Sequence, residues 1–413
     1  MPVDDADSPA ERGSVEPDYG IDDRRADTAA PVVSHRWQHR VPTGRTARPL
    51  VTTPSGLLPH DVRRAEGNRL ARQPGLAVMG GLVFVLPVAV ALAYGVGGAE
   101  GSVRVLSPLT TFALPVVALI AFWWEDWPGT RLRSDWTGWV DTALVLIGAI
   151  ILTMAGQAVT ARLDLVGIFD PGAGPEHSAT FPATLPLAGA GFVMMLQLTL
   201  ACERWPFRRF NRTLSGLLAL VVSAVVAVVS TWTVVAVTEP VAGASVRPGL
   251  MGGADFGAMI VTIAVWQTVV FVVLRGWPLN LIEARVPRLL ANNATVVAGG
   301  LLTYWVLSSG SGLPAETINS VCGCVVAGGL LVGMLFEGWP PWARRWGSLA
   351  LVAVVSAALF VLLTGIADML SWQRATPSDW VSYTTLNAIG LAVLLHVGIG
   401  RRWPFHRIPE ERT

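Results

Sequence analysis

A tryptophan–proline pair recurs five times in this sequence, each time at the end of an apolar run. The five tryptophans are 78, 72, 62 and 64 residues apart, which leaves room for two membrane helices and a loop between consecutive copies. Proline disfavours helix in the residue before it, and tryptophan prefers the level of the lipid headgroups. Each pair therefore predicts a membrane helix that ends at the membrane interface.

A charged residue stands two positions before each tryptophan. An arginine suits the dipole at the end of a helix, whereas a glutamate opposes it, so the glutamates need partners. The repeated motif, to which we assign a structural role, consists of Glu125, Trp127, Pro128, Glu203, Trp205, Pro206, Arg275, Trp277, Pro278, Glu337, Trp339, Pro340, Arg401, Trp403 and Pro404.

We expect glutamate–arginine pairs to tie the helix ends together. The candidate partners follow closely in the same segments and are Arg131, Arg133, Arg208, Arg209, Arg344 and Arg345. The alternative is that these groups are solvated interfacial charges, each of which contributes little to stability.

The composition, with 52% hydrophobic and 14% charged residues, is that of a multi-spanning membrane protein. Ten apolar runs have nearly the length that a bilayer requires. They are 75–96, 107–124, 138–160, 184–202, 214–238, 256–275, 294–309, 318–336, 347–367 and 382–400. The predicted fold is therefore an all-α polytopic membrane protein of about ten transmembrane helices, arranged as five parallel helical-hairpin repeats that each end in a Trp-Pro motif.

Three regions divide the chain. Residues 1–73 are rich in Asp, Arg and Pro and show no sustained apolar period, which predicts a disordered cytoplasmic tail. Residues 74–408 form the predicted transmembrane domain, and 409–413 form a short cytoplasmic C-terminal tail. Trp37 stands among basic residues of the first tail, which could dock on anionic lipid or on a cytoplasmic protein, although a merely solvated tail is the simpler interpretation. Nothing in the sequence indicates a nucleic-acid partner.

The distribution of arginine predicts the orientation in the membrane. Of 30 basic residues, all of them arginine, 26 lie in the N-terminal tail and the Trp-Pro segments, and 4 lie in the opposite loops. Arginine-rich loops are cytoplasmic. We therefore expect both termini and all five Trp-Pro pairs on the cytoplasmic side of a bacterial inner membrane.

Few polar groups interrupt the apolar runs, and each is a candidate functional residue because polar groups in a membrane are costly. The candidates for a polar intramembrane or ligand-binding role are Gln197, Gln267, Asn387, His396 and Asp141. Hydrogen bonding between helices also explains the amides, packing explains the lone histidine, and a position near a helix N-terminus explains the aspartate.

The sequence lacks the residues that several kinds of chemistry require. Without lysine there is no Schiff-base lysine and no Walker-type phosphate loop. A single histidine within the runs cannot supply two axial haem ligands, and no cluster has metal-ligand spacing. No acid lies near the middle of a run, where an ion-coupled pump carries one. We therefore assign no catalytic, cofactor-binding or metal-binding residue and expect no cofactor.

Three functions remain open. The first is a transporter or permease for a small uncharged or amphipathic substrate without ion coupling, which the repeats, the Gly-rich helices and the neutral amides favour. The second is a non-enzymatic scaffold or sensor that recruits a cytoplasmic partner through residues 1–73. The third is a membrane-embedded enzyme acting on lipid, with Asp141, His396 and the cytoplasmic glutamates as acid–base groups.

Overall fold

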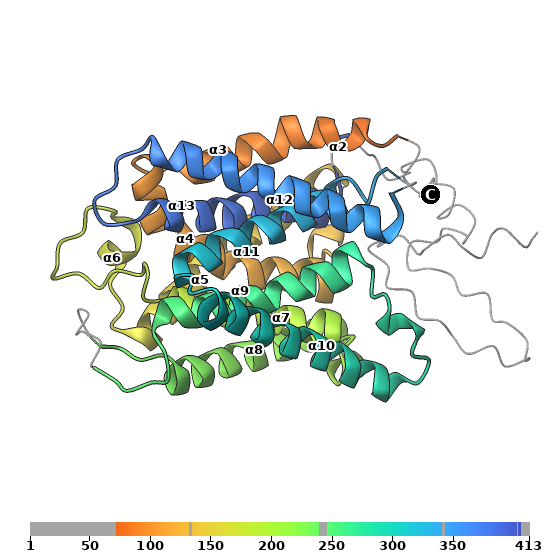
Figure 1. Ribbon diagram of the computed structural model, residues 1–413, viewed down its shortest axis with the longest axis horizontal. Coiled ribbons are helices and arrows are strands. Elements are labelled where there is room, and N and C mark those ends of the chain that lie inside the picture. The colour runs from red at the N-terminus through yellow and green to blue at the C-terminus, as the bar shows by residue number, and fades with distance from the viewer. Residues whose placement is uncertain (1–71, 132–133, 239–245, 341–342, 403, 406–413) are drawn as a thin grey trace, which may run out of the picture.

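The computed structural model describes residues 72–131, 134–238, 246–340, 343–402 and 404–405. Within them, nine helices are long and apolar enough to cross a membrane, and a tenth apolar helix, Leu185–Ala201, is shorter. These helices follow the long axis of the molecule (Figure 1). The same residues hold two isolated β-bridges and no strand. The prediction of an all-helical multi-pass membrane protein is confirmed, whereas the predicted tails lie almost wholly outside the described residues.

Five helices form an inner ring, and each ends in a π-helical segment just before a Trp-Pro motif. Between 56% and 83% of each of the four long ones is buried. In chain order the inner helices are α4 with η3 (Gly98–Ala118, Leu119–Trp123), α7 with η5 (Leu185–Leu196, Gln197–Ala201), α9 with η7 (Gly253–Gln267, Thr268–Val273), α11 with η10 (Ala315–Leu330, Leu331–Leu335), and α13 to η13 (Pro377–Tyr383, Thr384–Ile389, Gly390–Val393, Leu394–Ile399).

Five outer helices cover this ring. Only 17% to 33% of each is buried, and their outward side chains are large and apolar, as lipid contact requires. The outer helices are α2 to α3 (Gly75–Gly80, Gly81–Val85, Leu86–Tyr94), α5 (Ser134–Thr160), α8 (Arg212–Val234), α10 with η9 (Arg285–Trp305, Val306–Gly310) and α12 (Arg344–Asp368). A short helix, α6 (Leu165–Phe169), lies in the longest loop at the end of the bundle opposite the Trp-Pro motifs (Figure 1).

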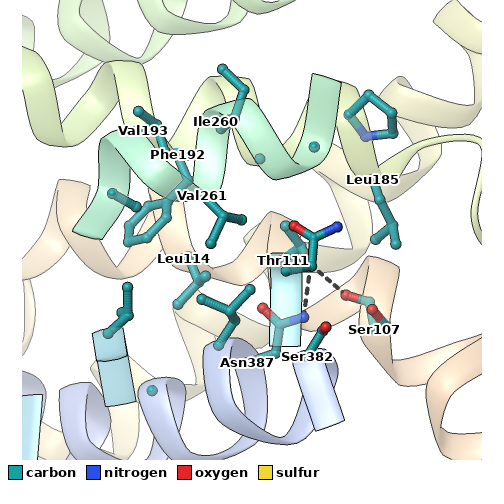
Figure 2. A pocket seen from close by; sticks show the side chains of 18 of the residues that line it. Ser107, Thr111, Leu114, Leu185, Phe192, Val193, Ile260, Val261, Ser382 and Asn387 are labelled. Atoms are coloured by element: carbon teal, nitrogen blue, oxygen red, sulfur yellow. Dashed lines mark hydrogen bonds between the residues drawn. The ribbon is translucent and has the colours of Figure 1, made fainter. Parts of the chain in front are cut away.

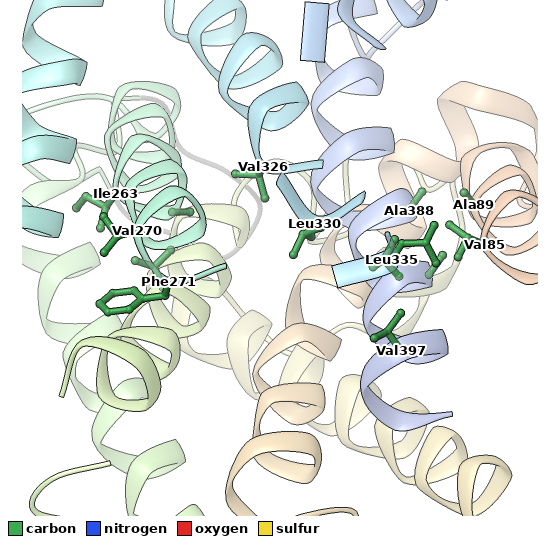
Figure 3. Close-up of a cluster of buried hydrophobic side chains, with 14 of the residues drawn as sticks. Val85, Ala89, Ile263, Val270, Phe271, Val326, Leu330, Leu335, Ala388 and Val397 are labelled. Carbon is green, nitrogen blue, oxygen red and sulfur yellow. The ribbon is translucent and has the colours of Figure 1, made fainter. Parts of the chain in front are cut away.

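The inner ring is closed. Each inner helix contacts the next in chain order, and the last one contacts α4 again. The outer helices α5, α8, α10 and α12 each pack on the inner helix that precedes them, and α3 packs on the last inner helix. Figure 3 shows Val85 and Ala89 of the first outer helix beside Ala388 of the last inner helix, within the largest apolar core.

The second and seventh helices depart most from the predicted boundaries, because each begins nine residues earlier than predicted, at Gly98 and Arg285. For the seventh, the sequence predicts 294–309, whereas the structure has a helix over Arg285–Gly310. The polar first turns of the seventh helix are stabilised by protein partners, because Arg288 pairs with the partly buried Glu203 at 2.7 Å and Asn292 donates to the carbonyl oxygen of Ala201 at 3.3 Å. Hydropathy alone misses such a segment because its polar groups face protein instead of lipid.

Two glycines in outer helices give a matched test of this packing. A Cβ on Gly300 of α10 would lie 2.7 Å from the Cα of Ile263 in α9, whereas a Cβ on Gly365 of α12 meets nothing within 4 Å. Overpacking of this kind costs about 1–3 kcal/mol. We expect Gly300→Ala to lower the melting temperature in detergent and Gly365→Ala to leave it unchanged or raised. Equal effects of the two substitutions would contradict this arrangement of α9 and α10.

Candidate functional site

All five inner helices end in the same backbone structure. The residue three positions before the tryptophan donates its N–H to the carbonyl five residues earlier, as Trp124 does to Leu119 at 2.9 Å. The residue just before the tryptophan donates to the carbonyl six residues earlier, as Asp126 does to Ile120 at 2.9 Å. The other four ends repeat this pair of bonds, with donors Cys202 and Arg204, Leu274 and Gly276, Phe336 and Gly338, and Gly400 and Arg402.

Two consecutive left-handed residues make the turn that follows. They stand immediately before each tryptophan, with φ between 47° and 82°, and only Gly276 and Gly338 among the ten are glycine. The Trp-Pro bond is cis in the four copies where both residues are described, and Trp403 of the fifth lies outside the described residues. We call these segments the five turns. They place a charged side chain at the rim of the ring in every copy.

Ion pairs and one backbone contact join the turns into a ring. The links are Glu125–Arg204 at 3.4 Å, Glu203–Arg288 at 2.7 Å, Glu337–Arg402 at 2.9 Å, Asp126–Arg401 at 2.5 Å, and a 2.7 Å hydrogen bond from Arg275 to the carbonyl oxygen of Glu337. Four of these links join neighbouring turns directly, and Glu203 links the second turn to the first turns of α10, the helix that follows the third turn.

The predicted glutamate–arginine pairing is therefore confirmed. Glu125, Glu203 and Glu337 each pair with an arginine of another turn or helix, which differs from the expectation that Arg131, Arg208, Arg209 or Arg345 of their own segments would serve. The side chains of Arg133 and Arg344 lie outside the described residues. Arg131 and Arg345 lie over the rings of Trp127 and Trp277 instead, at 5.6 Å and 4.9 Å from the ring centroids.

Inside the ring lies a cavity of about 1030 Å³ that all five inner helices line. Its middle is largely apolar, with wall residues that include Leu114, Phe192, Val193, Ile260 and Val261. Figure 2 shows these side chains around the space, with the polar residues Ser107, Thr111, Ser382 and Asn387 on one side. The cavity extends to charged residues of the turns at one end and of the opposite loops at the other.

Two of the five polar candidates line this cavity. Asn387 donates to Thr111 Oγ1 at 3.0 Å, which links the last inner helix to α4 across the wall. Gln267 donates to Gln197 Oε1 at 2.7 Å and to the carbonyl of Val193 at 3.0 Å, while its own Oε1 has no hydrogen-bond partner among the described residues. Gln197 stands behind Gln267 and donates to Asn293 at 2.8 Å. The amides thus connect neighbouring helices, and one acceptor in the wall is left unused.

The other two candidates pack behind the wall. His396 stacks on Phe84, with ring centroids 5.1 Å apart, and lies close to Gly80; neither ring nitrogen has a hydrogen-bond partner in the described part of the chain. Asp141 accepts a 3.1 Å hydrogen bond from the N–H of Gly129 and so holds the first turn to α5. Neither side chain lines the cavity.

The sequence did not identify two kinds of residue as lining the cavity, namely small neutral residues of the wall and arginines of the turns. Ser107 and Thr111 are small and neutral, and nothing in the apolar run marks them as facing the interior. Arg204, Arg275 and Arg402 lie in the turns and line the cavity. Their recurring place one or two positions before Trp-Pro is a signal in the sequence that could have identified them. Among the described residues no group of three His, Cys, Asp or Glu side chains could hold a metal ion.

Comparison with models of protein families, with curated proteins and with solved structures finds no match to this chain.

The ion pairs of the turns differ in burial, which predicts different effects on stability. The Glu337 and Arg402 side chains are 9% and 4% exposed, and breaking such a pair typically costs about 3–5 kcal/mol. The Glu125 side chain is 53% exposed, and a surface pair of this kind contributes about 1 kcal/mol or less. We expect Glu337→Gln to lower the melting temperature in detergent clearly and Glu125→Gln to leave it near that of the wild type. Similar melting temperatures for both variants would contradict a buried electrostatic link.

Asp126 predicts a dependence of stability on pH. Burial raises the pKa of this carboxyl to about 6, although Arg401 opposes the shift. Between about pH 4 and pH 6 the native state therefore binds more protons than the unfolded chain, so stability falls as the pH rises through this window. We expect the melting temperature of the wild type, measured against that of Asp126→Asn, to fall between about pH 4 and pH 6, and the difference between the two proteins to stay constant above about pH 6. An increase in this difference between about pH 4 and pH 6 would contradict the prediction.

Proposed function

We propose that this protein is a permease-like membrane protein that lets small uncharged or amphipathic molecules cross the bilayer through its central cavity. The observation that carries the proposal is the cavity itself, which is enclosed by five inner helices and reaches from the turns to the opposite loops. Concave, mostly apolar spaces with a few polar groups are where proteins bind small molecules.

The wall chemistry supports transport without ion coupling. All three acidic residues that line the cavity lie at its ends, Glu337 in a turn and Glu316 and Asp379 in the first turns of α11 and α13. The middle offers apolar surface, hydroxyls and amides. Such a wall can solvate an amphipathic molecule, but among the described residues it holds no carboxylate at mid-depth to bind a coupling ion.

We further infer that the molecule consists of five copies of one helical hairpin with parallel orientation. The shared hydrogen bonds and left-handed residues of the five turns support this, as does the alternation of outer and inner helices. With the arginine distribution, the turns and both termini would face the cytoplasm of a bacterial cell.

The two other functions have less support from the described residues. An acid–base pair of Asp141 and His396 would need a shared substrate site, and both side chains pack behind the cavity wall. Recruitment of a partner through the N-terminal tail concerns residues that the structure does not describe.

Transport through the cavity can be tested with a bulky substitution that fills the cavity and with the same substitution outside it as a control. Gly257 lines the cavity, and its nearest neighbouring atom, Asn319 Nδ2, is 3.9 Å from a Cβ built there. In proteoliposomes loaded with a panel of small uncharged and amphipathic solutes, we expect protein-dependent flux that Gly257→Trp abolishes. Gly365→Trp, which places the same side chain on the open face of α12, should retain the flux.

Two results would overturn the proposal. One is the absence of protein-dependent flux over the whole panel. The other is flux that survives Gly257→Trp unchanged, since molecules would then cross by another route. The melting temperature of each variant shows that the bundle has folded before flux is compared.

A further inference from the structure

The charges that line the cavity are distributed unevenly between its two ends. At the end opposite the turns the lining holds Arg247, Arg374, Glu316 and Asp379, so positive and negative charges balance. At the turns the lining holds Arg204, Arg275, Arg402 and Glu337, three positive charges against one negative charge. The cavity therefore ends in an excess of positive charge on the side of the turns.

Arg402 already has partners within the protein for its charge and for its hydrogen-bond donors. Its side chain is 4% exposed, lies 2.9 Å from Glu337 Oε1, and donates to the carbonyl oxygens of Leu335 and Met334 at 2.9 and 2.5 Å. It neutralises Glu337 and fastens the fifth turn to the end of η10. The excess charge therefore rests on the other two arginines.

Arg275 is the less compensated of these two. Its guanidinium donates one hydrogen bond, to the neutral carbonyl oxygen of Glu337 at 2.7 Å, and makes no other within the described part of the chain. A guanidinium carries five N–H donors and binds carboxylate or phosphate oxygens in a forked geometry. Burial lowers the pKa of Arg275 and the charge of Glu337 opposes this shift, so the net lowering means that the charged guanidinium is poorly solvated here.

Arg204 contributes the second positive charge. Its partner Glu125 lies 3.4 Å away and is 53% exposed, and Glu125 does not line the cavity. A pair that is so open to solvent is weak and can be exchanged for a ligand group at little cost. Two guanidiniums from neighbouring turns are thus available at the same end of one cavity.

The wall next to these arginines is apolar. Leu200 and Phe271 line the cavity four residues before Arg204 and Arg275, which is about one helical turn toward its middle. Met334 lines it three residues before Glu337. A molecule with its charged group at the turns would therefore place the rest of its length against apolar side chains.

We propose that the cavity binds single-chain amphipathic anions, with a carboxylate or phosphate head held by Arg275 and Arg204 and the apolar chain lying toward Phe271 and Leu200. The inference rests on the proposed function in that it narrows the class of molecule carried by the same cavity. Hydrogen bonds to charged groups are stronger than those to neutral groups, so the head group decides the affinity.

Binding can be measured on the full chain in nanodiscs of neutral lipid, with empty nanodiscs to subtract partitioning into lipid. Decanoate and decyl phosphate are the anionic probes, and decanol is the neutral probe of equal chain length. We expect both anions to bind at least tenfold more tightly than decanol. Preference for decanoate alone or decyl phosphate alone would identify which head group the site accepts.

Three variants locate the site. Arg275→Gln and Arg204→Gln should each reduce the affinity for the preferred anion tenfold or more, and each should narrow the difference between that anion and decanol. Arg208→Gln is the matched control, because Arg208 is exposed in η6 (Phe207–Arg209) and lies outside the cavity lining. It should bind like the wild type. If Arg275→Gln fails to fold, Arg204→Gln gives the same information, because Arg204 is 25% exposed and its partner Glu125 is 53% exposed.

The inference is overturned if anions and decanol bind equally, or if both cavity variants bind anions like the wild type. Flux of uncharged solutes is measured on the same preparations. Flux without selective anion binding would reject this inference alone and leave the proposed function standing. Selective anion binding without any flux would support the site and reject transport.

Discussion

The structure depends on a turn that two left-handed residues make at the end of every inner helix. Eight of these ten positions carry side chains other than glycine, and each such residue costs about 1–3 kcal/mol in backbone strain. The turn persists because the backbone hydrogen bonds before it and the ion pairs around it are formed together. It ends the helix at a fixed depth and sends the chain outward to the next outer helix.

The same turn explains why charge collects around one end of the cavity. The two left-handed residues before each tryptophan lie at the end of an inner helix, where a residue of another turn or helix contacts them. Glu337 meets Arg402 and Arg275 there, while Asp126 meets Arg401. Because these pairs connect different turns, they position the inner helices relative to one another. Of the arginines that line the cavity at this end, Arg402 has a buried carboxylate partner, whereas Arg275 and Arg204 do not. The positive charge at this end of the cavity therefore follows from which turns pair with one another.

Patterns within one segment of the sequence predicted the helices and their ends, but they did not predict which segments contact one another. The apolar runs and the Trp-Pro pairs identify the helices and their ends because length, hydropathy and proline act within one segment. The partners of the glutamates depend on which turns become neighbours, and Arg401 lies 275 residues from Asp126 in the chain. His396 and Asp141 stand out in apolar runs, yet both satisfy packing behind the wall. Thr111 carries no such signal, although it lines the cavity and accepts a hydrogen bond from Asn387.

Closure of the ring joins the two ends of the transmembrane chain. Tyr383 and Trp380 of the last inner helix donate to the carbonyl oxygens of Leu92 and Ala93 at the end of α3, at 2.7 and 3.2 Å. In an open array of repeats each unit needs only its neighbours, and terminal units can be capped separately. Here the first outer helix covers the last inner helix, and α4 contacts it from the other side. The cavity therefore exists only when the first and last helices have met, because four hairpins would leave its wall open to lipid.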